Sequence, residues 1–456
     1  KEPSPENSSC QASATPQSTP EPSKQTSQIN DTNTPKRTCR PFTDKMMQTA
    51  HKNQQKGSAV SEQTKTKVQA RLVIDFGNSE TRVAVLVNGK SSPVTILPNA
   101  FAAIGDDYVI PDQYVAEEIN GKPNELRSII LRAPQGLAAG EPTHLYAAGP
   151  LADREFGMSA TRPSSAIATK AQSETTLWSF HYALYIGREL VAKLLRKKPD
   201  ALEVTWDVTL LAPPSETGKG DVFKKIFTLA KSVEIIAPER VSIPIKVGDV
   251  SVLAEGLAGF IATVFTPLMG TVADYADCVN EPIIVIDFGA GTADVTFIKS
   301  LNPIASASAS YPVGGNTIAS LVSKYVHQEY GRTLSREAAT EAVLTGTIRS
   351  GAKRKDVSSQ VNAARNEVAG TITSRLRETF EANRFAPNEF AYLLIIGGGA
   401  IKPEKTEPIA ESVVRQVRSF APDIELLPVK EGINLRTLNI EGAINFARYA
   451  DKNAKK

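Results

Sequence analysis

Two segments of the chain share one pattern of apolar and polar positions. In each segment an apolar run ends in the pentapeptide Val-Ile-Asp-Phe-Gly, at residues 73–77 and again at 285–289, and small polar residues follow. A second apolar run then completes a match between 71–86 and 282–297. This pattern predicts strand, tight turn and strand in both places. The duplication indicates one binding clamp that is built from two halves.

The rest of the chain alternates between strand-like and helical patterns from residue 68 onward, which favours an α/β architecture. We predict further buried strands at 204–211 and 392–396, and helices at 176–195, 251–268, 317–330, 335–345, 358–382 and 408–420. The expected organisation is a first half over 68–275, with an insertion at about 97–150, and a second half over 276–456, with a charged, mainly helical insertion at about 317–390.

Residues 1–67 differ from the rest in composition. They are rich in Ser, Thr, Pro, Gln and Asn and cannot bury enough apolar surface to offset the entropy of ordering, so we predict a disordered low-complexity tail. The tail holds ten Lys or Arg and six Asp or Glu, a net charge of +4. Its basic cluster at 36–40 is either part of a solvated linker or a weak contact for an acidic partner or nucleic acid. Direct nucleic-acid binding elsewhere is not expected.

Composition narrows the class of protein. A chain of 456 residues with 41% hydrophobic content is long enough for two or three domains. The longest apolar candidate, 252–269, is interrupted by Glu255, two Gly and Pro267, so we expect no transmembrane helix and no direct membrane contact. Three scattered Cys and no visible targeting signal suggest a reducing cytoplasm. The four His show no metal-ligand spacing, and no structural metal is expected.

The two turns carry the residue types that bind phosphate. Small residues in a strand–turn–strand hairpin let backbone N–H groups approach phosphate oxygens, and both Gly77-Asn78-Ser79 and Gly289-Ala290-Gly291-Thr292 qualify. Asp75 and Asp287 stand at the base of these loops. A hydrated Mg²⁺ bound to phosphates is usually held by one or two carboxylates, which two facing hairpins would supply. The alternative is a strand-ending turn that binds no ligand.

Two more glycine-rich segments are candidates for nucleotide contacts. The apolar strand 393–396 runs into three consecutive Gly, where the backbone can pack flat against a base or ribose; the alternative is a flexible loop. The segment 313–317 opens a helix, whose N-terminus favours an anion or ribose hydroxyls; the alternative is a plain turn with an Asn cap. The candidate residues are Gly314, Gly315, Asn316, Gly397, Gly398, Gly399 and Ala400.

The order of these motifs resembles the ATPase superfamily of actin and the heat-shock chaperones. The resemblance covers roughly 70–448, and the octapeptide at 287–294 is its most specific part. Within the superfamily the chain most resembles bacterial plasmid-segregation actins of the ParM/StbA type, because 97–101 reads Leu-Pro-Asn-Ala-Phe and there is no room for a chaperone's substrate domain. The connection between Glu255 and Asp287 is longer than the family pattern, and the tail is not part of it. The implied fold is the duplicated, ribonuclease-H-like actin fold, with two halves around a nucleotide cleft.

The resemblance also implies roles for single residues. Asp75 would hold Mg²⁺ through water, and Asp287 would position that ion or the attacking water. Glu255 matches a helix whose Glu orients the hydrolytic water, although a Glu at a helix start is also favoured by the helix dipole. Lys324 would reach the ribose or base, or else is a solvated lysine.

The resulting hypothesis is an ATPase that binds ATP or GTP with Mg²⁺ and assembles into nucleotide-dependent filaments. A plasmid-segregation actin would move DNA through a DNA-binding adaptor protein. The alternatives are a non-polymerising small-molecule kinase or chaperone-like ATPase of the same fold, and a regulatory relative in which the nucleotide only locks the fold.

Overall fold

The computed structural model describes residues 65–115, 118–119, 122–123, 128–138, 140–163, 169–430 and 432–453. Nearly all of the predicted tail lies outside these residues. Its last residues belong to the fold, because strand β1 begins at Thr66, which pairs with Leu202 of strand β10. The tail boundary at residue 67 is therefore corrected. Within the described part of the chain, no helix has the length and apolar character needed to cross a membrane.

The first half is built on a sheet with the strand order β13-β10-β1-β2-β3, and β4 also pairs with β2. Its strands are β1 (Thr66–Phe76), β2 (Glu80–Val87), β3 (Lys90–Ser91), β4 (Thr95–Pro98), β10 (Leu202–Ala212) and β13 (Val247–Ala254). Strands β1, β10 and β13 run parallel, and β2 returns antiparallel to β1. The first predicted hairpin is therefore confirmed.

The second half repeats this topology. Its sheet has the order β21-β20-β14-β15-β16, and β17 also pairs with β15. The strands are β14 (Ile283–Phe288), β15 (Ala293–Lys299), β16 (Asn302–Pro303), β17 (Ala309–Tyr311), β20 (Tyr392–Ile396) and β21 (Glu425–Leu426). Strands β14, β20 and β21 are parallel, and β15 is antiparallel to β14. The duplication read from the sequence is thus a duplication of the sheet.

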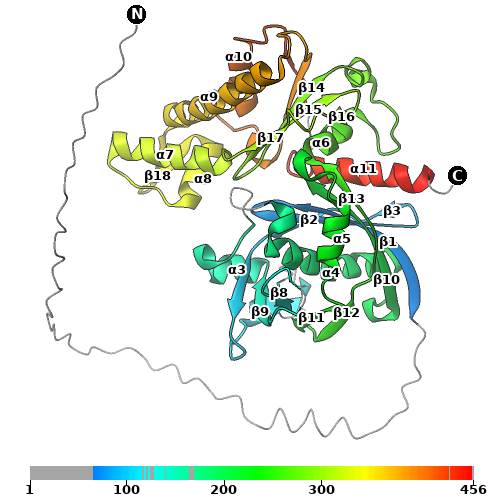
Figure 1. Cartoon of the computed structure of the whole chain (residues 1–456). Helices are drawn as coiled ribbons and strands as arrows, with labels where there is room; N and C mark the ends of the chain where they lie inside the picture. The colour runs from blue at the N-terminus through cyan, green and yellow to red at the C-terminus, as the bar shows by residue number, and fades with distance from the viewer. Residues whose placement is uncertain are drawn as a thin grey trace, which may run out of the picture. The chain divides into compact units, whose positions relative to one another are not determined.

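Two helices join the halves. Helix α6 (Glu255–Val264) follows the first sheet but contacts β14 and β15 of the second, whereas α11 (Leu438–Asn453) contacts β1 and β2 of the first. Figure 1 shows both helices between the two sheets. The two helices cross closely, and Gly442 permits this, since a Cβ added there would overlap the backbone of Ala258. A side chain at Gly442 would therefore push the halves apart.

The predicted helix at 251–268 is wrong at both ends. Residues 251–254 belong to β13, where Ser251 pairs with Thr209 and Leu253 with Leu211 of β10. Helix α6 starts only at Glu255 and ends at Val264. Pairing with a neighbouring strand overrides the local helical pattern here, which a single sequence does not reveal.

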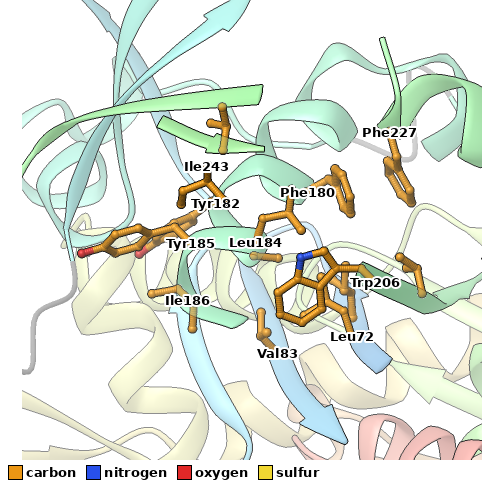
Figure 2. Packing of buried hydrophobic residues seen from close by; sticks show 14 of the residues in the cluster. Leu72, Val83, Phe180, Tyr182, Leu184, Tyr185, Ile186, Trp206, Phe227 and Ile243 are labelled. Carbon is orange, nitrogen blue, oxygen red and sulfur yellow. The ribbon is translucent and has the colours of Figure 1, made fainter. Parts of the chain in front are cut away.

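The core of the first half lies between its sheet and helix α4 (Glu174–Leu195). Trp206 and Leu72 of the sheet pack against α4, as Figure 2 shows. Gly187 lets the helix approach the sheet closely: a Cβ added there would lie only 2.9 Å from Leu72 Cδ1. Phe180 stacks on Phe227 with ring centroids 3.9 Å apart. These contacts fix the first sheet, and with it the loop that follows β1.

The remaining elements flank the two sheets. A small sheet of order β12-β11-β8-β9-β5 draws on the predicted insertion at 97–150 and also on 232–244, two strands that the sequence reading missed. Helices α7, α8, α9 and α10 lie where the pattern predicts helices. The bounds are β5 (Phe101–Ile104), β6 (Glu118–Ile119), β7 (Lys122–Pro123), β8 (Ile129–Pro134), β9 (Thr143–Ala148), β11 (Ser232–Ala237), β12 (Val241–Pro244), β18 (Thr347–Ser350), β19 (Lys353–Asp356), α2 (Asp112–Val115), α3 (Pro150–Glu155), α5 (Gly220–Phe227), α7 (Gly315–Tyr330), α8 (Arg336–Thr345), α9 (Ser358–Asn383) and α10 (Ile409–Val417), with short 3₁₀ turns η1 (Gly157–Ser159), η2 (Lys170–Gln172), η3 (Pro199–Ala201), η4 (Pro214–Glu216), η5 (Ala273–Cys278) and η6 (Gly398–Ala400).

Candidate functional site

The loops after β1 and β14 form the same backbone turn. Gly77 N donates to Glu80 O at 2.9 Å, and Gly289 N donates to Thr292 O at 2.8 Å. A Cβ added at Gly77 would lie 2.9 Å from that Glu80 oxygen, so the turn requires glycine there. Both loops begin at the carboxyl end of a parallel strand, where α/β proteins commonly bind ligands.

The two loops face each other across one cavity of about 350 Å³. A Cβ added at Gly291 would lie 3.2 Å from Asn78 Nδ2, which places the tips of the two loops side by side. Arg436, just before α11, forms an ion pair with Glu80 of the first loop. The cavity is therefore lined by residues of both halves, and an ion pair in its lining joins the two halves.

Helix α7 begins directly against the second loop. Gly315 N donates to Gly289 O at 3.0 Å, and Asn316 N donates to Ala290 O at 2.8 Å. Gly314 is extended rather than left-handed, but a Cβ there would lie 2.8 Å from the Ala290 carbonyl. The glycine pair thus lets a helix N-terminus, which favours anions, approach the loop.

The triple-glycine turn after β20 also needs its glycines. Gly397 adopts a φ of +94°, a conformation that favours glycine, and a Cβ there would overlap the Asp287 carboxylate. A Cβ at Gly399 would lie 2.6 Å from the Phe288 ring. The turn therefore lies flat against the end of β14 and forms a wall of the cavity.

Each hairpin places a charged pair across its two strands, and the pairs differ. Asp75 lies opposite Arg82 in the first hairpin, with 2.7 Å between Arg82 Nη1 and Asp75 Oδ2. Asp287 lies opposite Asp294 in the second. All four side chains line the cavity. The duplicated clamp thus offers one cation from the first half and a pair of acids from the second.

Glu255, at the start of α6, forms a nearly buried ion pair in the cavity. Its Oε1 lies 2.5 Å from Lys170 Nζ, and the two side chains are 9% and 13% exposed. Lys170 also donates to Leu211 O at 3.2 Å. Burial raises the pKa of Glu255 to about 8 against the opposing charge of Lys170, and Asp294 raises it further. Glu255 can therefore exchange a proton near neutral pH, as a general base must.

The acids of the second hairpin crowd one another. Burial raises the pKa of Asp287 to about 7, and the charges of Asp294 and Asp75 add to the effect. Burial also raises the pKa of Asp294. Asn439 of α11 donates to Asp287 Oδ2 at 2.6 Å, while its own Oδ1 is buried without a hydrogen-bond partner.

This oxygen-rich end of the cavity fits a hydrated divalent cation. A nearby cation would relieve the repulsion that raises the pKa of Asp287. Within the described ranges, no three His, Cys, Asp or Glu side chains are arranged to hold a metal ion directly. An ion such as Mg²⁺, which keeps several of its waters and needs only one or two carboxylates, fits this set of oxygen donors.

Part of the cavity lining is apolar. Val343 and Leu344 of α8 and Ile401 form this part together with Arg365 of α9. Leu344 is 42% exposed and Ile401 is 37% exposed, which is unusual for large apolar side chains in a cavity wall and suits a planar ligand that covers them. Arg365 donates to Val343 O at 2.7 Å and Glu407 O at 2.8 Å, and burial lowers its pKa to about 10. Arg365 therefore links α8 to the segment that precedes α10 and stabilises an apolar slot formed by Val343, Leu344 and Ile401.

Most of the predicted site residues line this one cavity. They are Asp75, Gly77, Asn78, Ser79, Glu255, Asp287, Gly289, Ala290, Thr292, Gly315, Asn316, Gly397, Gly398 and Gly399. Gly291 lies close to Asn78, Gly314 lies close to Ala290, and Ala400 is buried.

The structure does not bring Lys324 to the cavity. Its side chain is exposed and its Nζ lies 5.9 Å from the Tyr325 ring centroid. The reason is the periodicity of α7, which buries Ile318, Val322 and Val326 and so turns position 324 to solvent. The prediction that Lys324 contacts the ribose or base is therefore corrected: Lys324 is an exposed lysine outside the cavity lining.

Several cavity residues were missed from the sequence. Arg82 and Asp294 each stand seven positions after the aspartate of their hairpin, so the predicted strand pairing could have found them. Lys170 and Arg365 carry no local signal, because they come from a short turn and a distant helix. Arg436 comes from the segment that leads into α11, and Asn439 comes from the first turn of that helix.

Comparison with known proteins supports the fold. The family model "Archaeal actin homologue MreB-like, C-terminal" matches residues 285–406. Comparison with the curated proteins gave no match. Among solved structures, the archaeal actin homologue Ta0583 is 15% identical with a TM-score of 0.54, and the match covers 83% of this chain and 99% of that one. The actin-like protein Alp7A is 16% identical with a TM-score of 0.58, and the match covers 86% and 98%. Bacillus thuringiensis ParM with AMPPNP is 14% identical with a TM-score of 0.54, and the match covers 84% and 99%. At these identities the likeness establishes an actin-like fold, and the fold predicted from the motifs is confirmed.

Proposed function

We propose that this chain, with its actin-like fold, binds and hydrolyses ATP with Mg²⁺ and that the bound nucleotide controls its assembly into filaments. The observation that carries the proposal is the convergence of both duplicated loops, their charged pairs and the Glu255–Lys170 pair on one cavity. The B. thuringiensis ParM structures carry ATP, ADP and AMPPNP.

The two loops and Arg82 would hold the phosphates. Backbone N–H groups of the loops are donors that small residues leave accessible, and Arg82 is a cation at the cavity wall. Mg²⁺ would neutralise phosphate charge when bound. Asp75, Asp287 and Asp294, which line the cavity, would hold its waters.

Glu255 and Lys170 would position the attacking water. Phosphoryl transfer depends mostly on positioning and charge stabilisation, and a carboxylate within hydrogen-bond reach of water can accept its proton. Lys170 keeps the carboxylate oriented through its 2.5 Å contact with Oε1. The apolar slot of Val343, Leu344 and Ile401 would hold the base.

The close crossing of α6 and α11 would couple the nucleotide bound in the cavity to the relative position of the two halves. Glu255 starts α6 and Asn439 lies in the first turn of α11, so both helices carry a residue of the site. A change at the phosphates would shift the two halves relative to each other and alter a filament contact. Head-to-tail contacts that do not close into a ring give open filaments. Movement of DNA through a bound adaptor is the corresponding cellular role.

The test is light scattering of the purified protein after addition of ATP with Mg²⁺, with ADP as control and phosphate release followed in parallel. A rise in scattering that decays as phosphate appears is the expected result. Steady phosphate release with flat scattering would refute filament assembly and leave a monomeric ATPase or a kinase. No binding of ATP would refute the nucleotide site itself.

A further inference from the structure

The hairpin of β18 and β19 carries exposed positive charge that the nucleotide site does not use. Its ten residues, 347–356, contain two Arg and two Lys with one Asp, and residues 349–356 are all exposed. Arg349 and Arg354 lie directly opposite each other in the ladder. Like charges in such a cross-strand pair destabilise a hairpin, so the fold itself gains nothing from this arrangement.

Part of the charge is already satisfied within the chain. Arg354 donates to Glu341 at 3.3 Å, and Lys355 Nζ lies 3.2 Å from the centroid of the Tyr330 ring. Asp356 accepts from Ser358 N at 2.9 Å, at the start of α9. Among the described residues, Arg349 and Lys353 have no ion-pair partner. These two side chains are free to meet an anionic surface.

A groove of opposite charge lies elsewhere on the same half. It has a volume of about 410 Å³ and is lined by η5 and the segment 425–430. Asp277 and Glu425 line it, and Glu281 lies close by, since all three raise the pKa of the Cys278 thiol in addition to the larger effect of burial. Lys430, which also lines the groove, is paired with Asp274 at 2.8 Å. The groove therefore presents an excess of negative charge.

The basic hairpin, a separate two-stranded sheet, and the acidic groove lie toward opposite ends of the parallel strands of the second sheet. The groove contains Tyr392 and Glu425, the first residues of β20 and β21, and so lies at the amino ends of the parallel strands. The hairpin extends from α8, whose Val343 lines the nucleotide cavity at the carboxyl ends. Figure 1 shows β18 beside α7 and α8 and apart from β14 and β15. One copy cannot easily bring the two surfaces together, but two copies in succession can.

We infer that the β18–β19 hairpin of one molecule docks into the acidic groove of a second copy of this chain and forms the longitudinal contact of the filament. The inference rests on the proposed function, because it specifies the surfaces through which the assembly forms. Two different complementary surfaces on one molecule make a heterologous contact, which repeats without closing when the rotation does not return to the start. The nucleotide cavity lies next to the root of the hairpin, so the bound state can bias the contact.

The experiment is a charge swap measured by sedimentation and light scattering with ATP and Mg²⁺. The hairpin variant is Arg349→Glu/Lys353→Glu, and the groove variant is Asp277→Lys/Glu281→Lys. Each alone is expected to raise the critical concentration by about tenfold or more, because like-charge juxtaposition at an interface is strongly unfavourable. The chain with all four substitutions regains opposite charges and is expected to assemble within about threefold of the original, with weaker assembly at high salt.

Controls separate the contact from general effects. Lys193→Glu/Lys198→Glu changes the net charge by the same amount as the hairpin variant, at two exposed positions of the first half. This control is expected to leave assembly unchanged. Retained ATP binding and an unchanged circular dichroism spectrum show that each variant is folded. Where a reversal disturbs folding, Arg349→Gln/Lys353→Gln tests the same surface.

The outcomes separate this inference from the proposed function. Failure of the original chain to assemble would overturn both. Normal assembly of the hairpin variant, or failure of the four-substitution chain to recover, would overturn the docking contact and leave the ATPase filament in place. If the hairpin variant assembles normally but loses binding to a short DNA duplex, the hairpin is a nucleic-acid surface and the inference is wrong.

Discussion

Replacement of Asp287 by Asn is expected to stabilise the protein in the absence of nucleotide and metal and to abolish the proposed ATP hydrolysis. The carboxyl of Asp287 has a pKa of about 7 in the fold, raised by burial and by the neighbouring acids, against an ordinary value of 3.8. A carboxyl with a raised pKa favours the folded state while it is protonated, and this contribution is lost as the pH rises through the folded pKa. Without a bound cation, the ionised carboxyl of Asp287 therefore destabilises the folded protein at alkaline pH.

The magnitude follows from the two pKa values. At about pH 5 the folded carboxyl is still protonated while that of the unfolded chain is ionised, and at about pH 8 both are ionised. Each pH unit between pH 5 and the folded pKa changes the free energy of unfolding by about 1.4 kcal/mol, so about two units give about 3 kcal/mol. The stability gain of Asp287→Asn over the original chain should therefore be about 3 kcal/mol larger at pH 8 than at pH 5. Asn439 can keep its hydrogen bond by donating to the new amide oxygen.

The assay is urea denaturation at both pH values without nucleotide or metal. Asp277→Asn is the matched control, because Asp277 is exposed and lies outside the cavity. ATP hydrolysis by Asp287→Asn should fall sharply under the same conditions. An equal stability difference at the two pH values would refute the reasoning, because it would show that the carboxyl is not held near neutrality by its surroundings.

Three further substitutions test other parts of the structure. Glu255→Gln should slow phosphate release by about 10²–10⁴-fold with ATP affinity retained. The original chain should release phosphate faster as the pH rises toward about 8, the pKa of Glu255. Equal single-turnover rates of the variant and the original chain would exclude Glu255 as the base. Arg82→Ala should weaken ADP and ATP binding by about tenfold or more in calorimetry, since bonds to charged groups contribute about 1.5–3 kcal/mol, whereas the half-exposed Arg132→Ala should not. His181→Leu should gain stability over the original chain by about 3 kcal/mol as the pH falls from about 6.5 to 4, because burial lowers the pKa of His181 to about 4 and only the unfolded chain takes up the proton; a constant difference in denaturation midpoints would contradict this.

Part of the site was predictable because it is local. The turn after Asp75 and the turn after Asp287 each need glycine for a hydrogen bond to a residue three positions later. This requirement is visible in a short stretch of consecutive residues. The same holds for the triple-glycine turn at 397–399, whose first residue has a positive φ. Two copies of a local pattern then implied the duplicated fold, and the comparisons bear that out.

Helix boundaries and side-chain directions were less secure. The segment 251–254 satisfies a helical pattern, yet it pairs with β10 because the parallel ladder satisfies its backbone groups and buries Leu253. Lys324 was assigned to the site from its position after a glycine pair, but the turn of α7 points it to solvent. Both errors arise because a neighbour in space, not in sequence, decides the outcome.

The sequence by itself determined the duplicated strand–turn–strand units, the glycines that the turns require and the acids at their bases, because each depends on contacts within a few residues. Only the tertiary structure decided which charges meet in the cavity. Lys170 reaches Glu255 across 85 residues, and Arg436 pairs with Glu80 across 356, and neither separation follows a period that a sequence displays. The physical reason is that burial sets the strength of these charges and the pKa of Glu255, and burial exists only once both sheets and their two joining helices have packed.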